Sequence, residues 1–62
     1  MRYPMKRAAY GEEPVYVGVF QQIELCVDMI RQQEGANMKF AYIGDVIICY
    51  GGSALWEIGH VD

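Results

Sequence analysis

Apolar side chains recur at three- and four-residue steps in one part of the chain, residues 21–34. They form a stripe made of Ile23, Cys26, Val27 and Ile30, while the opposite positions are mostly polar or charged. This spacing is typical of an amphipathic helix, and Gly35 is a usual helix terminator. No Ser, Thr, Asp or Asn precedes Gln21, so the start of the predicted helix is poorly defined.

The other apolar residues follow the patterns of β-strands. Residues 15–20 are β-branched and aromatic, which predicts a strand, and Gly18 within them indicates a bulge or a close backbone approach. Residues 38–43 alternate, with Met38, Phe40 and Tyr42 on one side and Lys39, Ala41 and Ile43 on the other. Residues 5–10 can add a short N-terminal strand, followed by a turn at residues 11–14.

The C-terminal half of the chain predicts an antiparallel meander over residues 38–61. Gly44-Asp45 is a two-residue hairpin signal, which makes residues 46–50 the partner of residues 38–43. Residues 54–61 are expected to return as a third strand, with Trp56, Ile58 and His60 on one side. A short helix there is the alternative.

Together these elements predict a single α+β domain over residues 1–62. We expect a small antiparallel sheet of three to five strands in the order β-α-β-β-β, with one helix packed on one face. Residues 46–50 are apolar at every position, which is typical of strands buried on both faces. One helix covers only one face. The second face must therefore meet the N-terminal segment, another copy of the chain or a different protein, and we favour another chain.

Composition and charge narrow the class of protein. The chain has 62 residues, 53% of them hydrophobic, and a net charge of −3. Residues 1–9 carry +3 and residues 10–62 carry −6, so a basic head precedes an acidic body. An acidic body argues against phosphate-backbone binding as the main activity. No apolar leader or membrane-spanning run follows Met1, so we expect a cytoplasmic protein without a membrane.

The sequence offers no catalytic or cofactor signature. Cys26, Cys49 and His60 invite a metal or nucleophile site, but their spacing contains no pair of local soft ligands. Gly51-Gly52-Ser53 lacks the Lys of a phosphate-binding loop, and a turn explains its glycines. We therefore expect no enzyme, no metal and no cofactor, and reduced thiols in place of a disulfide.

The residue types enriched at protein interfaces are abundant. The candidate partner-binding residues are three acids of the predicted helix and four aromatic residues: Glu24, Asp28, Glu34, Tyr16, Tyr42, Tyr50 and Trp56. The acids are either solvated charge or a stripe that imitates nucleic-acid phosphates. The aromatic residues are either a dense core or an interface. Arg2, Lys6 and Arg7, interleaved with Tyr3 and Tyr10, are the alternative, a nucleic-acid-binding arm.

These observations favour a small non-enzymatic regulator or inhibitor that binds a larger protein or complex with a basic groove. Chains of this size and composition are often phage or mobile-element proteins, so a host nuclease or defence complex is the target class we expect. Self-association as a homodimer is expected from the excess of apolar surface. The alternatives are a nucleic-acid-associated regulator that uses the basic head and a minimal enzyme, or enzyme subunit, with a Cys/His site.

Overall fold

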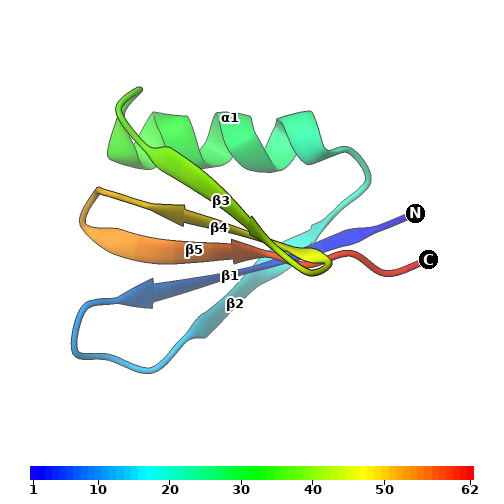
Figure 1. Cartoon of the computed structure of the whole chain (residues 1–62), viewed down its shortest axis with the longest axis horizontal. Coiled ribbons are helices and arrows are strands. Elements are labelled where there is room, and N and C mark those ends of the chain that lie inside the picture. Colours follow the sequence, from blue (N-terminus) through cyan, green and yellow to red (C-terminus); the bar gives the residue numbers. More distant parts are fainter.

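Five strands form one antiparallel sheet, and a single helix lies across one of its faces (Figure 1). The computed structural model describes residues 1–62 in full. The elements are β1 (Tyr3–Ala9), β2 (Val15–Phe20), α1 (Ile23–Glu34), β3 (Lys39–Ile43), β4 (Val46–Tyr50) and β5 (Ala54–Ile58). The α+β class is confirmed, with an N-terminal strand that makes the order β-β-α-β-β-β. The helix is too short and too polar to cross a membrane.

The strands lie in the order β2-β1-β5-β4-β3. Two hairpins, β1-β2 and β3-β4, stand at the two sides, and β5 joins them by pairing with both β1 and β4. The N-terminal residues are therefore an inner strand of the sheet rather than a free arm. Because they lie within the sheet, they do not cover its second face.

Local sequence signals explain the boundaries of most elements. Gly44 has φ 60°, the value needed at the first position of the tight β3-β4 hairpin. The β1-β2 register shifts beside Gly18, which is the bulge predicted there. The helix begins at Ile23, two positions later than expected, and Gln22 supplies no side-chain cap. Residues 54–58 are a strand, so the helical alternative for the C-terminal segment is wrong.

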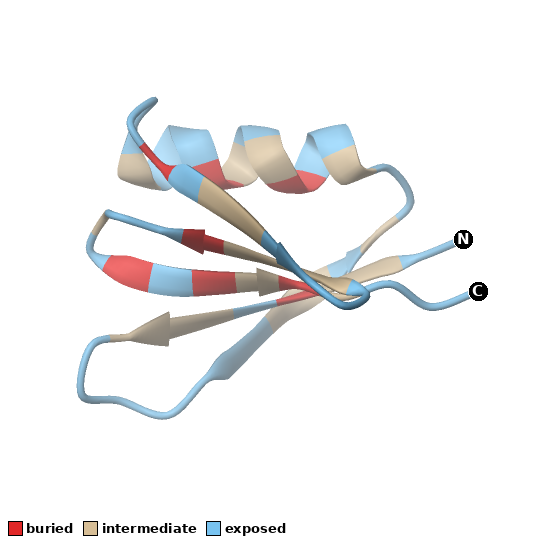
Figure 2. Ribbon diagram, viewed as in Figure 1, coloured by how far each residue is buried: buried red, intermediate tan, exposed pale blue.

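The core lies between α1 and the near face of the sheet (Figure 2). Its eight buried residues are Met5, Cys26, Ile30, Met38, Cys49, Ala54, Trp56 and Ile58. Figure 2 places the buried positions of α1 on the side toward the sheet. Trp56 is the largest fully buried side chain, and it lies on the middle strand of the sheet. A core of this kind uses one face of each strand, as the predicted alternation of residues required.

The opposite face of the sheet is covered by no part of the chain (Figure 1). We call it the open face. It carries the residues that alternate with the core positions, and most of them are apolar: Pro4, Lys6, Ala8, Tyr16, Val19, Lys39, Ala41, Ile43, Val46, Ile48, Tyr50, Leu55 and Glu57. Several of these apolar side chains are strongly exposed, including Ile43 at 65% and Val19 at 48%. Contiguous apolar surface of this kind marks interaction sites.

Candidate protein-binding surfaces

A groove of about 240 Å³ runs between α1 and β3 on the helix side of the sheet. It is lined by Ile23, Glu24, Val27, Asp28, Arg31, Phe40, Tyr42 and Ile47. Cys26 and Ile30 of α1 face the core. The adjacent face of the helix extends past the core toward the edge strand β3, and the groove lies between this helix face and β3. Its floor is apolar and its helix rim is charged.

The electrostatics of this groove follow from helix geometry. Glu24 and Asp28 are four residues apart, so both carboxylates lie on one rim of α1, about one turn apart. The guanidinium of Arg31 lies 6.0 Å from the centre of the Phe40 ring, a cation–π contact that places the one cation over the apolar floor. The groove thus presents two carboxylates against one cation.

Tyr42 marks the outer side of the groove. It lies on β3 opposite Ile47 of β4, and its side chain is 78% exposed. β3 pairs only with β4, so its other edge is free. A free strand edge has unpaired N–H and C=O groups that can pair with an added strand. Groove and edge together form a surface suited to an extended peptide.

The open face carries a row of five residues, one from each strand, that lie side by side across the sheet. In sheet order they are Tyr16, Lys6, Glu57, Ile48 and Ala41. Lys6 and Glu57 are direct cross-strand neighbours on β1 and β5, flanked by Tyr16 and Ile48. The row therefore reads aromatic, cation, anion, aliphatic, small.

The seven candidate partner-binding residues do not form one surface. Glu24, Asp28 and Tyr42 lie together at the groove. Tyr16 and Tyr50 lie on the open face, on the other side of the sheet. Trp56 is fully buried, so it belongs to the core and contacts no partner in this conformation. The prediction that Trp56 binds a partner is therefore corrected. Trp56 is buried because β5 is the middle strand of the sheet and lies under the helix.

Glu34 has a different role from the other two acids. Its carboxylate accepts hydrogen bonds from the backbone N–H of Ser53 at 2.6 Å and from the Ser53 hydroxyl at 2.7 Å. These bonds, the hydroxyl first, hold the pKa of Glu34 below its usual value. Glu34 therefore ties the end of α1 to the β4-β5 turn.

The three basic residues of the alternative arm point in different directions. Lys6 lies on the open face, whereas Arg7 lies on the helix side with its guanidinium 5.5 Å from the centre of the Trp56 ring. Arg2 is outside β1 and pairs with Val61 through two backbone hydrogen bonds. Residues on opposite faces of a sheet cannot contact the same stretch of nucleic acid, so no basic patch forms.

The two cysteines lie in the core, whereas His60 lies beside Tyr3 and Asp62. Cys26 and Cys49 are buried free thiols. Burial raises the pKa of Cys26, and burial followed by the nearby Cys26 raises the pKa of Cys49 to about 11. Both are therefore protonated at neutral pH and are poor nucleophiles.

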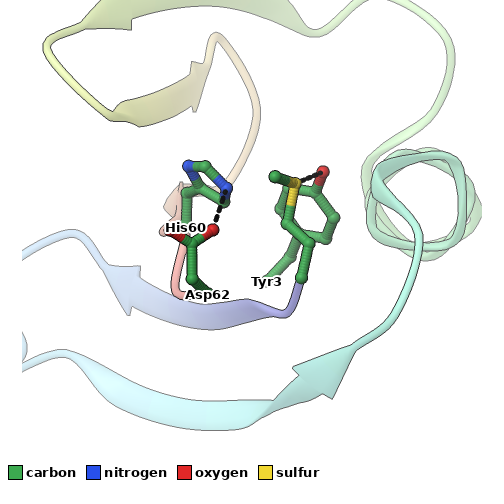
Figure 3. A network of polar contacts seen from close by, with 4 residues as sticks. Tyr3, His60 and Asp62 are labelled. Atoms are coloured by element: carbon green, nitrogen blue, oxygen red, sulfur yellow. Dashed lines mark hydrogen bonds and ion pairs between the residues drawn. The ribbon is translucent and has the colours of Figure 1, made fainter.

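His60 belongs to a small cluster where the chain ends meet (Figure 3). Its Nε2 lies 3.6 Å from Oδ1 of Asp62, and its ring stacks on Tyr3 with 5.6 Å between centroids. The Tyr3 hydroxyl donates to the sulfur of Met1 at 3.1 Å. This cluster contains neither cysteine, and no group of three or more metal-ligating side chains occurs in the structure.

Sequence reasoning missed several residues of these surfaces. Phe40, Ile47 and Arg31 line the groove, and only the placement of α1 beside β3 brings them together. The alternation of residues 38–43 and 46–50 did indicate which side each residue takes, but not how far the helix extends over them. Lys6 and Glu57 are 51 positions apart in the chain. No local pattern predicts that they are neighbours.

No family model, curated protein or solved structure matches this chain.

Proposed function

We propose that this chain is a non-enzymatic protein-binding regulator or inhibitor that receives an extended basic segment of a larger partner in the α1–β3 groove. The observation that carries the proposal is the combination of an apolar floor, a rim with Glu24 and Asp28, and the free edge of β3 in one place. Apolar contact and edge pairing would supply affinity. The two carboxylates would select positive charge.

The chemistry of the groove defines the class of partner. An added strand turns every second side chain to the helix side of the sheet, so these residues would be the basic ones. Their aliphatic stems would lie on the apolar floor at Phe40, and their charges would face Glu24 and Asp28. Two carboxylates one helical turn apart also resemble successive phosphates in charge. A protein that binds nucleic acid through a basic surface, such as a nuclease or a defence complex, is the target class we propose. A cytoplasmic location stays a prediction from the sequence.

The two alternatives have weaker support. A nucleic-acid-binding arm needs Arg2, Lys6 and Arg7 on one surface, and two of them lie on opposite faces of an inner strand. A Cys/His enzyme needs a reactive thiolate, and the raised pKa values of both buried thiols disfavour one.

The experiment uses a short synthetic peptide in which lysine and valine alternate, titrated into the isotope-labelled protein and followed by NMR. We expect shift changes centred on Phe40, Tyr42 and Val27, and a titration that weakens as salt is added. A peptide with glutamate in place of lysine should bind much less well. The E24Q/D28N variant should bind the lysine peptide about tenfold more weakly, because it removes both carboxylates of the rim.

The matched control is E12Q/E13Q, which makes the same charge change in the exposed β1-β2 turn away from the groove. It should bind the lysine peptide like the unmodified protein. The proposal is wrong if the two peptides bind equally, or if the shift changes lie elsewhere than on α1 and β3.

A further inference from the structure

We propose that the open face is the contact surface of a symmetric homodimer in which the Lys6–Glu57 pair of one copy stacks, with reversed order, on that of the other. The occupant of the open face is thus a second copy of this chain. This inference goes beyond the groove proposal and does not depend on it, because the open face and the groove lie on opposite sides of the sheet.

The first argument is the order of side chains in the cross-strand row. Its first four members, Tyr16, Lys6, Glu57 and Ile48, lie on adjacent strands at one level of the sheet. When the row is reversed and laid on itself, Lys6 faces Glu57 of the other copy and Tyr16 faces its Ile48. Every contact is then cation with anion or aromatic with aliphatic. The open face is self-complementary, which is what a two-fold interface requires.

The symmetry axis follows from this match. A two-fold axis that runs parallel to the strands, between β1 and β5, turns one sheet over onto the other. It places β1 over β5 of the second copy and β2 over β4, with the strands of the two sheets nearly aligned, as in β-sandwiches. β3 extends beyond the overlap, so Lys39 faces no residue of the other copy. The α1–β3 groove remains on the outside of the dimer.

The second argument concerns what the open face would otherwise leave in water. Tyr16, Val19, Tyr50 and Leu55 are all more than a third exposed in the single chain. The sandwich buries them and separates the charged pair from solvent on both sides. A partner surface of a single charge sign would be attracted by one of Lys6 and Glu57 and repelled by the other. A second copy places an opposite charge against each of them.

The size of the overlap sets the expected affinity. Four strands about 4.8 Å apart and five residues long cover roughly 300 Å² in projection. The accessible area buried per copy exceeds this projected area because side chains make the surface uneven, but it stays below the roughly 800 Å² per partner of a standard stable interface. The dimer should therefore dissociate on dilution, with a dissociation constant roughly in the micromolar range.

The test is sedimentation of the purified full chain and of two charge-reversal variants, K6E and E57K, alone and mixed. Each variant alone would place like charges opposite each other in the dimer, so each should dimerise at least about tenfold more weakly. In an equimolar mixture every facing pair is again of opposite charge, and dimerisation should return. The charges within each chain are the same alone and mixed, so recovery on mixing can only come from contact between copies.

Two further variants keep the test decisive. K39E makes the same Lys-to-Glu change on the same face but outside the overlap, and it should dimerise like the unmodified chain. The double reversal K6E/E57K restores opposite charges both within and between chains, and it should fold and dimerise normally even where a single variant is poorly folded. Circular dichroism records the folding of each variant.

Three results would overturn the proposal. The first is an unmodified chain that stays monomeric up to millimolar concentration, which would leave the open face to a different protein or to solvent. The second is dimerisation that is unchanged in both K6E and E57K. The third is a mixture of these two variants that shows no recovery.

Discussion

Ser53 donates two hydrogen bonds to the carboxylate of Glu34, one from its backbone N–H at 2.6 Å and one from its hydroxyl at 2.7 Å. This contact joins the last residue of α1 to the turn between β4 and β5, 19 positions later in the chain. The helix has no side-chain cap at its start. The Glu34–Ser53 contact, which we call the clasp, is therefore the side-chain hydrogen bonding that holds α1 over the sheet. The groove depends on the placement of α1, and therefore on this contact.

Replacement of Glu34 by Gln should lower the free energy of unfolding by about 1 kcal/mol at pH 7, because a charged acceptor is exchanged for a neutral one near the surface. The pKa of Glu34 is lowered from 4.5 in the folded protein. Its contribution to stability is therefore complete above pH 4.5 and is lost as the pH falls through the lowered folded pKa. Urea unfolding at pH 7 and at decreasing acidic pH measures it.

The matched variant for this experiment is E12Q, which removes an exposed carboxylate from the β1-β2 turn. It should change stability little at either pH. A stability difference between E34Q and the unmodified protein that persists in full at pH 2 would contradict the role given to the ionised carboxylate.

A side chain at Gly52 would have to displace the ends of two neighbouring side chains. A Cβ atom built there meets the Glu34 carboxylate, and it lies 2.8 Å from the sulfur of Met38. G52A should therefore destabilise the protein by about 1–3 kcal/mol, because either the clasp or the core must shift. Most of this cost should overlap with that of E34Q, so the double variant should be less unstable than the sum of the two. Strict additivity, measured by urea unfolding, would show that Gly52 acts independently of the clasp.

Cys49 should make the protein less stable at alkaline pH. Its folded pKa is raised from 9.0 to about 11 by burial and by the nearby Cys26. Between these values the unfolded thiol ionises while the folded thiol stays protonated, so stability falls as the pH rises above 9. From pH 8 to pH 10 the loss from this residue is about 1 kcal/mol. Urea unfolding of C49A under reducing conditions should show a correspondingly smaller loss over the same interval.

The comparison with C49A concerns the change between the two pH values, because the substitution also removes core contacts at every pH. If C49A and the unmodified protein lose the same stability from pH 8 to pH 10, the thiol is not protected from ionisation in the folded state.

The sequence could predict the elements that depend on local patterns. The helix stripe through Cys26 and Ile30 and the alternation in β3 and β4 follow from side-chain periodicity alone. Gly44 at the hairpin and Gly18 at the bulge follow from backbone requirements. In each case the physical cause lies within a few residues of the signal, so the pattern is readable without the fold.

The sequence could not predict relationships that depend on long-range pairing. β1 pairs with β5 across most of the chain, and nothing local indicates that the N-terminal segment is an inner strand. The sequence is equally consistent with Trp56 in the core and with Trp56 at an interface. Only the position of β5 in the middle of the sheet distinguishes the two. The same pairing separates Lys6 from Arg7 and brings Lys6 beside Glu57. Glu24, Asp28 and Tyr42 of the groove were among the candidate residues, whereas Phe40, Ile47 and Arg31 were not, and the grouping could not be predicted.

Another copy of this chain is expected to cover the open face. The most direct measurement follows side-chain methyl NMR signals as the protein is diluted from millimolar to low micromolar concentration. We expect the Ile48 methyl signals, on the open face, to move with concentration, while those of Ile30, in the core, stay constant. Ile48 signals that stay constant over the whole range, with the chain monomeric throughout, would contradict the claim that copies of this chain meet through that face.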